Sequence, residues 1–287
     1  MIYIAQAMEE NGHPMYAPVA AYIRMCFGRD IRMDELTKSK VIEFRDYLKR
    51  IGLAQNTVKN KLNVLRTFTN IYNEEEPIPI KDKKVFNVKR EDSVNIYLDK
   101  FELTLLEKAI PRLSPADRYY AVKFLVGAYT GCRQSDILHI TPAHISNGML
   151  SYVAEKTGKK VTVPITQKTA DWITFIQEHY DEFDGAKSTP ASQRMVYNRH
   201  IRSACKAAYI NAPAVRVRGG KEVTEPKWKI VTSHTARRSF ATNLYLAGMD
   251  PHQVSKLLGH FSAEITLRCY ICAERTTMPE AALAYFQ

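Results

Sequence analysis

The chain has 287 residues and a mass of 32.8 kDa, which is long enough for two domains with separate hydrophobic cores. Its 41 Lys and Arg residues exceed its 30 Asp and Glu residues, and the net charge of +11 suits a polyanionic partner. The sequence lacks a run of about 18 apolar residues and a signal-peptide layout, and its 5 cysteines form an odd, scattered set that argues against a disulfide framework. We therefore expect a reduced, cytoplasmic protein with no membrane partner.

Helical periodicity dominates the first part of the chain. The periodicity predicts helices near residues 17–27, 37–50 and 56–72. Asn56 is the expected N-cap of the third helix, and Gly52 is expected to end the second.

The third of these helices carries a polar face opposite its apolar stripe. Lys59, Asn63 and Arg66 follow one another at i, i+4 and i+7. Such a face can lie along a DNA groove, although an ordinary solvated face is the alternative.

Prolines and mixed charges after residue 73 mark a linker. We expect a helical domain over residues 1–75, a basic linker over 76–97 and a second domain over 98–287 that ends in a C-terminal tail helix. Basic side chains of the linker would add salt-sensitive phosphate contacts, and they are Lys81, Lys83, Lys84, Lys89 and Arg90.

Two β-hairpins are predicted among the helices of the second domain, near residues 151–164 and 215–223. Lys156 precedes the Thr157-Gly158 turn of the first hairpin, and Lys159 and Lys160 follow it. A lysine on a rigid hairpin can reach into a groove and donate a proton, and its lysine neighbours would then face phosphates. A solvated hairpin tip is the default alternative.

Two arginines are candidates for binding a phosphodiester. Arg133 stands in Thr-Gly-Cys-Arg, and Arg237 stands in His-Thr-Ala-Arg. Guanidinium groups match phosphate oxygens bidentately and stay protonated. Many nucleases use paired Mg²⁺ ions held by clustered carboxylates instead, and no such acidic cluster stands beside these motifs. We therefore expect no metal or other cofactor.

A tyrosine that attacks phosphorus needs proton transfer, because a phenol with a pKa of about 10 is mostly neutral at pH 7. His234 can accept the phenolic proton, and Lys156 can donate one to the departing 5′ oxygen. Taken alone, each motif has an ordinary explanation. HxxR occurs by chance in many helices, Leu-Gly-His can be a simple helix end, and Tyr270 can be a half-buried core aromatic.

Together, these motifs resemble the tyrosine recombinases, or phage-type integrases. Family box I is similar to residues 129–138, the hairpin lysine to Lys156, and box II to residues 234–243 followed by Leu258-Gly259-His260 and Tyr270. Tyr270 stands ten positions after His260, one more than the usual family spacing, and an extra residue in a turn is readily tolerated.

The resemblance implies a mainly α fold with small β-hairpins, made of an N-terminal helical (SAM-like) core-binding domain and a mixed α+β catalytic domain. It implies that Tyr270 forms a covalent 3′-phosphotyrosine while Arg133 and Arg237 hold the scissile phosphate. His234 and His260 would hydrogen-bond around that phosphate, and Lys156 would protonate the leaving 5′-hydroxyl. Asp136 would orient an arginine or histidine, although a plain surface carboxylate is an equal alternative.

The expected function is site-specific recombination as an integrase, invertase or resolvase encoded by a bacterium, phage or mobile element. The partners implied are double-stranded DNA with inverted-repeat sites and, in some cases, accessory DNA-bending proteins. We expect monomers in free solution that assemble into a homo-tetramer on DNA. Two alternatives remain, namely relaxation of DNA as in a type IB topoisomerase, or DNA binding by a catalytically silent regulator.

Overall fold

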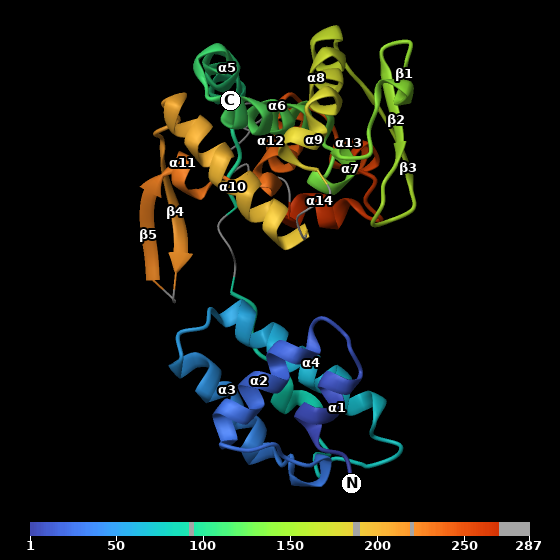
Figure 1. The fold of residues 1–287 in the computed structure, drawn as a ribbon, viewed down its shortest axis with the longest axis vertical. Helices are drawn as coiled ribbons and strands as arrows, with labels where there is room; N and C mark the ends of the chain where they lie inside the picture. Colours follow the sequence, from blue (N-terminus) through green and yellow to red (C-terminus); the bar gives the residue numbers. More distant parts are fainter. Residues whose placement is uncertain (92–94, 186–189, 219–220, 270–287) are drawn as a thin grey trace, which may run out of the picture. The chain divides into compact units, whose positions relative to one another are not determined.

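The computed structural model describes residues 1–91, 95–185, 190–218 and 221–269. These divide into two compact units, one built on residues 1–91 and the other on residues 95–216 and 224–269. No helix in the described ranges is long and apolar enough to cross a membrane. Both units are mainly helical (Figure 1).

The first unit is entirely helical, and its three predicted helices are confirmed to within one residue at each end. Its elements are α1 (Ile4–Glu10), α2 (Tyr16–Phe27), η1 (Met33–Glu35), α3 (Lys38–Arg50), α4 (Gln55–Ile71) and η2 (Lys83–Phe86). The apolar stripe of α4 forms the centre of the core, with Val58, Leu62 and Leu65 fully buried. Gly52 follows the end of α3 with a φ of 83°, a left-handed conformation that glycine adopts without strain.

The expected role of Asn56 as an N-cap is wrong. α4 begins one residue earlier, with Ala54 at the N-cap position and no side-chain cap. The Asn56 side chain instead holds the chain after η2, because Nδ2 donates to Glu91 O at 2.7 Å and Oδ1 accepts from Glu91 N at 3.1 Å. A distant backbone partner has therefore replaced the local capping bond.

The segment that follows α4 contributes to the same core. Ile78 and Ile80 are nearly buried, and Phe86 of η2 is fully buried. Gln55 Nε2 also donates to Lys89 O at 3.0 Å. Residues 76–91, which the sequence marks as linker, thus pack on the first unit over most of their length.

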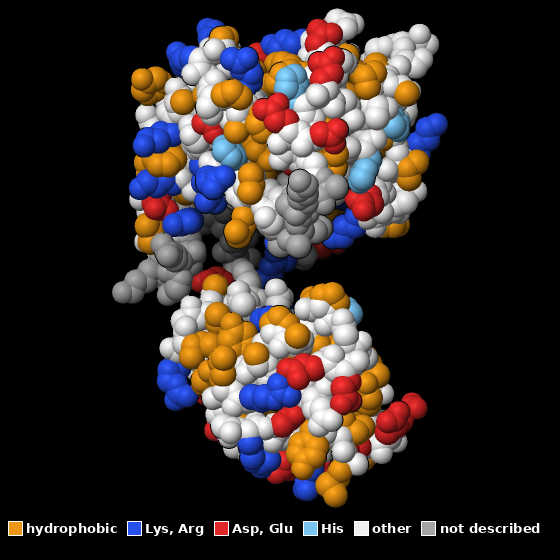
Figure 2. Space-filling model, in the orientation of Figure 1, with side chains coloured by type: hydrophobic (Ala, Val, Ile, Leu, Met, Phe, Trp, Pro, Cys, Tyr) orange, Lys and Arg blue, Asp and Glu red, His pale blue; other side chains and the backbone are white. Residues whose placement is uncertain are grey.

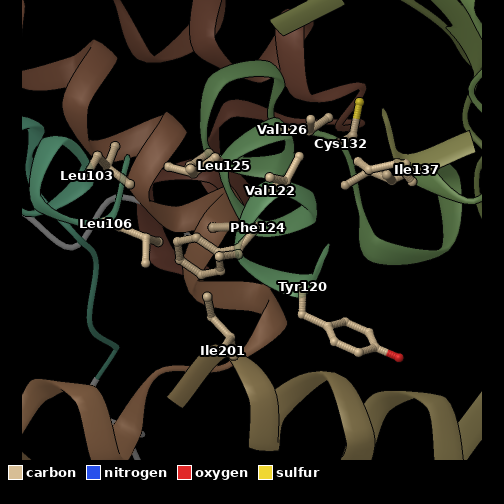
Figure 3. Packing of buried hydrophobic residues seen from close by; sticks show 14 of the residues in the cluster. Leu103, Leu106, Tyr120, Val122, Phe124, Leu125, Val126, Cys132, Ile137 and Ile201 are labelled. Carbon is tan, nitrogen blue, oxygen red and sulfur yellow. The ribbon is translucent and has the colours of Figure 1, made fainter. Parts of the chain in front are cut away.

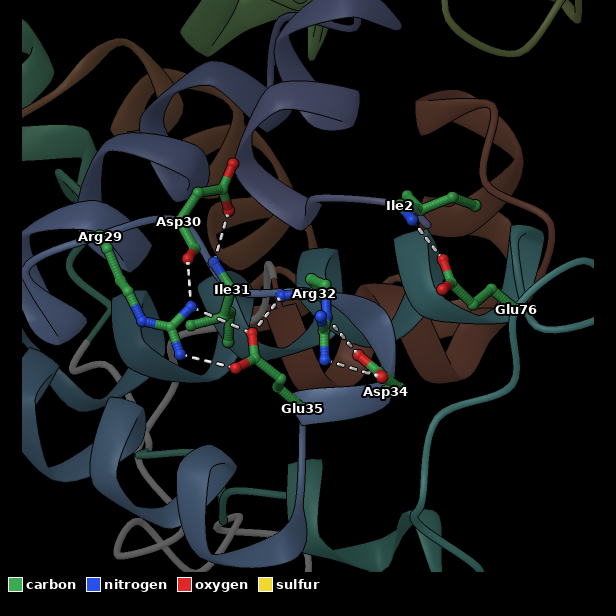
Figure 4. Close-up of polar contacts among 8 residues, drawn as sticks. All are labelled: Ile2, Arg29, Asp30, Ile31, Arg32, Asp34, Glu35 and Glu76. Carbon is green, nitrogen blue, oxygen red and sulfur yellow. Dashed lines mark hydrogen bonds and ion pairs between the residues drawn. The ribbon is translucent and has the colours of Figure 1, made fainter.

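A polar network fixes the start of α1, whose N-cap residue offers no side-chain acceptor. Asp30, in the loop after α2, accepts from the backbone N–H groups of Ala5 at 2.9 Å and Gln6 at 2.8 Å. These are N–H groups that a helix cannot satisfy internally. Glu35, the last residue of η1, binds the Arg29 guanidinium and the Arg32 backbone N–H (Figure 4).

The second unit surrounds one central helix, α6 (Pro115–Thr130), and carries two small antiparallel sheets, β1-β2-β3 and β4-β5. Both predicted hairpins, β2–β3 and β4–β5, are confirmed, whereas the two-residue strand β1 was not predicted. The remaining helices are α5 (Lys100–Ala109), η3 (Ile110–Arg112), α7 (Gln134–Ile137), η4 (Pro142–His144), α8 (Gln167–Glu178), α9 (Tyr180–Phe183), α10 (Pro190–Ala207), α11 (Lys227–Ile230), α12 (Ser233–Leu246), α13 (Pro251–Leu258) and α14 (Ala263–Cys269). The strands are β1 (Ile145–Ser146), β2 (Met149–Val153), β3 (Lys160–Pro164), β4 (Pro213–Arg218) and β5 (Lys221–Pro226).

Helix α6 is buried on almost every side, and it packs against α8, α10 and α12. Its apolar side chains point in several directions into the surrounding cluster, as Val122, Phe124 and Leu125 do in Figure 3. At Gly127 a Cβ atom would lie 3.1 Å from Ala236 Cβ, so α6 and α12 approach each other closely at this point. This contact brings the C-terminal end of α6 beside the HxxR helix α12.

Candidate active site

The Thr-Gly-Cys-Arg motif forms the turn that ends α6. Gly131 adopts a φ of 70°, and a Cβ at this position would lie 2.6 Å from Phe240 Cδ1 and 2.9 Å from Leu258 Cδ2. Only glycine meets both the conformational and the steric demand. The chain then leaves α6 so that Arg133 is the N-cap residue of α7, with an extended backbone.

Arg133 lies at the edge of the site with its side chain 14% exposed, and its nearest carboxylate is Asp136 Oδ2, 3.7 Å from Nη1. This distance is too long for a hydrogen bond, and within the described ranges Nη1 has no hydrogen-bond partner. A buried guanidinium nitrogen with an unused N–H group is suited to bind an anionic ligand by donating to it.

Asp136 is almost fully buried rather than a surface carboxylate. Its Oδ1 accepts from the backbone N–H of Glu155 at 3.1 Å. Glu155 lies in the loop between β2 and β3, directly before Lys156. Asp136 therefore ties the helix that follows Arg133 to the loop that carries Lys156.

Helix α12 supplies both residues of the HxxR motif, with His234 in its first turn and Arg237 one turn later. Arg237 is only 1% exposed. Its Nη1 donates to Gly131 O at 2.5 Å, and its Nη2 donates to Leu258 O and lies 3.0 Å from His260 Nε2. One side chain thus joins the end of α6, the end of α13 and the histidine that follows.

His260 follows the left-handed Gly259, which ends α13. A guanidinium group can only donate, so Nε2 must accept from Arg237 and the proton resides on Nδ1. Nδ1 then donates to Thr266 Oγ1 in α14, at 2.8 Å. Burial and the charges of Arg237, Arg133 and Lys159 lower the pKa of His260 to about 3, which keeps the imidazole neutral at physiological pH.

His234 differs from His260 because it remains exposed to solvent. The protein atoms packed around it and the charges of Arg238, Arg237, Arg133 and Arg194 still lower the pKa of its imidazole. A neutral imidazole at pH 7 is the form that can accept a proton.

The remaining predicted site residues are only partly described. Lys156 is exposed at the β2–β3 loop. Tyr270 lies outside the described residues, one position after the end of α14 at Cys269. The buried Thr266, four residues before Tyr270, anchors α14 to His260.

The basic residues expected to contact DNA occupy different surroundings. Lys59, Asn63 and Arg66 are half-buried on α4 of the first unit, and Arg66 Nη1 donates to Asn87 Oδ1 at 3.3 Å. In the second unit, Lys160 is exposed, whereas Lys159 is half-buried against the turn after α13.

Further basic side chains that the sequence reading did not single out line one edge of the second unit. On the face drawn in Figure 2, Lys and Arg side chains follow α10, α11 and β4. Lys206 of α10 and Lys229 of α11 are exposed, and their ammonium groups lie 5.2 and 5.6 Å from the centroid of the Trp228 ring.

The sequence motifs do not include Thr266 or Phe261. Their roles depend on contacts with His260 and Lys159, which no sequence motif indicates.

The chain is similar in sequence to known proteins. The chain is 23% identical over 249 residues to the tyrosine recombinase XerD of Oceanobacillus iheyensis, covering 81% of this chain and 77% of that protein. It is 28% identical over 177 residues to the integrase of Enterobacteria phage P21, covering 58% of this chain and 44% of that protein.

Solved structures share the fold. A lambda integrase dimer bound to a core site matches with a TM-score of 0.66 and 17% identity, covering 96% of both chains. The integrase of transposon Tn1549 in complex with a circular intermediate DNA matches with a TM-score of 0.68 and 15% identity, covering 100% of this chain and 99% of that one.

Family models match both units. The phage integrase SAM-like domain matches residues 5–87, which confirms the expected fold of the first unit. The model of the phage integrase family matches residues 96–276, well over half of the chain. The chain therefore belongs to the phage integrase family, the tyrosine recombinases that cleave and rejoin DNA.

Proposed function

We propose that this enzyme recombines double-stranded DNA at specific inverted-repeat sites, using Tyr270 as nucleophile and neither a metal nor ATP. The observation that carries the proposal is the position of Arg237, whose guanidinium binds Gly131 O, Leu258 O and His260. These bonds bring the motifs of Arg133, His234 and His260 into one cluster, to which Asp136 adds the loop of Lys156.

The proposed chemistry conserves the energy of the phosphodiester bond. The phenolic oxygen of Tyr270 gives its proton to His234 and forms a bond to phosphorus. The bond from phosphorus to the 5′ oxygen breaks, and that oxygen takes a proton from the Lys156 ammonium group. Rejoining reverses these steps, with a 5′-hydroxyl attacking the phosphotyrosine.

The two arginines act on different sides of this reaction. The unused Nη1 of Arg133 binds a non-bridging phosphate oxygen, where charge grows in the transition state. Arg237 is held from behind by carbonyl oxygens and by neutral His260, so its charge is fixed before the phosphate arrives. Such preorganised charge is often the largest catalytic contribution, and loss of one donor lowers rates by roughly 100- to 1,000-fold.

DNA binding is proposed to use both units. Residues 1–75 act as the core-binding domain, 76–97 as a basic linker and 98–287 as the catalytic domain. Lys59, Asn63 and Arg66 on α4, with Lys160 on β3, contact the duplex. Lambda integrase is known as a dimer on a core site and as a tetramer on a Holliday junction, which supports assembly of this chain into a tetramer on DNA.

The test is recovery of covalent protein–DNA adducts. Wild type and Tyr270→Phe are incubated with genomic DNA of the source cell, denatured in SDS, and the linked fragments are sequenced. Tyr245→Phe is the control, because Tyr245 is an exposed tyrosine of α12 outside the proposed machinery.

Wild type and Tyr245→Phe should give adducts at a few inverted-repeat sites, and Tyr270→Phe should give none. Scattered adducts would instead indicate topoisomerase-like relaxation. Binding without adducts would indicate a regulator, and adducts from Tyr270→Phe would show that another residue is the nucleophile.

A further inference from the structure

One lysine side chain joins the loop between β2 and β3 to the turn that follows α13. Lys159 Nζ donates to His260 O at 3.2 Å. The same ammonium group lies 3.9 Å from the centroid of the Phe261 ring. Phe261 is 74% exposed, so the ring is not part of the hydrophobic core. Its face offers the ammonium group a site at the surface.

The loop that Lys159 closes is short and internally bonded. Ala154 N donates to Lys159 O at 2.8 Å, and Gly158 N donates to Ala154 O at 2.8 Å. Lys156 lies between these residues. Because Lys159 belongs to the same bonded turn, fixing its side chain restricts where the Lys156 backbone can lie.

The two ends of the loop are held by different parts of the site. Asp136 Oδ1 binds the Glu155 N–H on one side, and Lys159 binds the His260 turn on the other. Directly after Lys159, β3 packs on the end of α13, where a Cβ on Gly259 would lie 2.7 Å from Val161 Cγ2.

Lys159 differs in this respect from its lysine neighbours. Lys156 and Lys160 are exposed, whereas Lys159 is half-buried and its ammonium group is occupied by protein partners. An ammonium group used in this way is poorly placed for a DNA phosphate.

We propose that Lys159 is a positioning residue that couples the Lys156 loop to the His260–Arg237 cluster, rather than a DNA contact. The inference rests on the proposed function, in which Lys156 protonates the 5′ oxygen as the bond from phosphorus to that oxygen breaks. Loss of Lys159 then misplaces the proton donor without removing it.

The experiment measures single-turnover cleavage of an oligonucleotide duplex that carries the site recovered from the covalent adducts. One version has the normal 5′ oxygen, and the other has sulfur at that bridging position, because a thiolate leaves without a proton. The variants are Lys159→Met, Lys159→Arg, Phe261→Leu, Lys156→Ala and the double variant Lys156→Ala/Lys159→Met.

Lys159→Met should slow cleavage of the oxygen substrate by about tenfold or more, part of the roughly 100- to 10,000-fold that a positioned proton donor contributes. Cleavage of the sulfur substrate should stay within about threefold of wild type, because that step no longer needs the donor. The double variant should be no slower than Lys156→Ala. Lys159→Arg, which keeps a donor and a cation over the ring, should recover most of the rate.

Phe261→Leu should slow cleavage of the oxygen substrate more than cleavage of the sulfur substrate, but by less than Lys159→Met does. Because Phe261 is exposed, misfolding of the variant would not explain such a defect. Lys168→Met is the matched control. It also removes an ammonium group that lies over an aromatic ring, 5.0 Å from the Trp172 centroid, but on α8 outside the site. It should leave both rates unchanged.

Equal slowing of both substrates by Lys159→Met would overturn the inference. So would weaker DNA binding with the slope of log K against log salt reduced by about 0.9, the mark of one lost phosphate contact. If sulfur rescues Lys156→Ala but not Lys159→Met, only this inference fails. If sulfur fails to rescue Lys156→Ala, the proposed role of Lys156 is itself wrong.

Discussion

At the scale of single residues, Arg237 combines a structural and a catalytic role. Its guanidinium is buried and donates to carbonyl oxygens at the ends of α6 and α13. Backbone carbonyl oxygens and the neutral imidazole of His260 thus hold this positive charge in place.

Arg237→Ala should therefore lower both cleavage and stability. The variant removes the Arg237 donors from Gly131 O and Leu258 O, and a cost of roughly 1–3 kcal/mol for each buried acceptor predicts a total loss of about 2–6 kcal/mol. Cleavage should fall by roughly 100-fold or more, with a much smaller change in DNA affinity. Urea unfolding, single-turnover cleavage and DNA titration check these three outcomes. Unchanged stability would show that the carbonyl bonds contribute little.

The low pKa of His260 predicts how stability depends on pH. The folded imidazole stays neutral down to about pH 3, whereas in the unfolded chain it protonates near pH 6.5. Between these values the unfolded state binds the extra proton, so stability is lost as pH falls below about 6.5. The slope from this one group is at most about 1.4 kcal/mol per pH unit.

Urea unfolding of wild type and His260→Gln at pH 6.5, 5.5 and 4.5 measures this contribution. The variant should lose stability less steeply, by about 1 kcal/mol per pH unit. The shift of His234 acts in the same direction and remains in both proteins. Equal slopes would mean that His260 titrates normally in the folded state.

Sequence motifs led to Arg237 and His260 but not to the bond between them. The HxxR pattern fixes which residues share a helix face, whereas the partner of a buried guanidinium depends on helices brought together from distant segments. The tautomer of His260 depends on Thr266 in the same way. Such contacts need the fold before they can be assigned.

At the scale of elements, the centre of the second unit contains a buried ion pair. Lys123 of α6 and Asp184, which follows α9, are almost fully inaccessible and bind each other directly. Tyr119 Oη also donates to Asp184 Oδ2 at 2.8 Å. The pair joins the central helix to the end of the α8–α9 segment.

Lys123→Met should destabilise the second unit by about 3–5 kcal/mol, because it leaves the Asp184 carboxylate buried without its cation. Lys123→Met/Asp184→Asn should recover part of that loss, since a neutral amide oxygen can still accept from Tyr119. Removal of the exposed Lys168–Glu107 pair by Lys168→Met should change stability by less than about 1 kcal/mol. Thermal and urea unfolding compare the three. A small effect of Lys123→Met alone would show that the carboxylate becomes protonated.

Element prediction succeeded where local pattern decides and failed where distant contacts decide. Apolar periodicity located α2, α3 and α4, and the Thr157-Gly158 turn located β2–β3. The N-cap role of Asn56 was wrong because Glu91, far along the chain, binds that side chain. β1 was missed because two residues give no alternation to detect.

At the scale of the whole molecule, the question is whether Tyr270 acts with the arginines of its own chain. Helix α14 ends one residue before Tyr270, and Thr266 within it binds His260 of the same chain. Since His260 in turn binds Arg237, the last described helix is attached to the arginine cluster of its own protomer. We therefore expect cleavage in cis.

Mixing two inactive variants tests this expectation. Tyr270→Phe keeps the arginines but lacks the nucleophile, and Arg237→Ala keeps the nucleophile but lacks an arginine. If each tyrosine serves its own site, a mixture on one DNA duplex has no complete site and should give no covalent adduct above either variant alone. If Tyr270 instead serves a neighbouring protomer, mixed assemblies form complete sites between chains. The mixture should then give up to about a quarter to a half of the wild-type amount of covalent adduct.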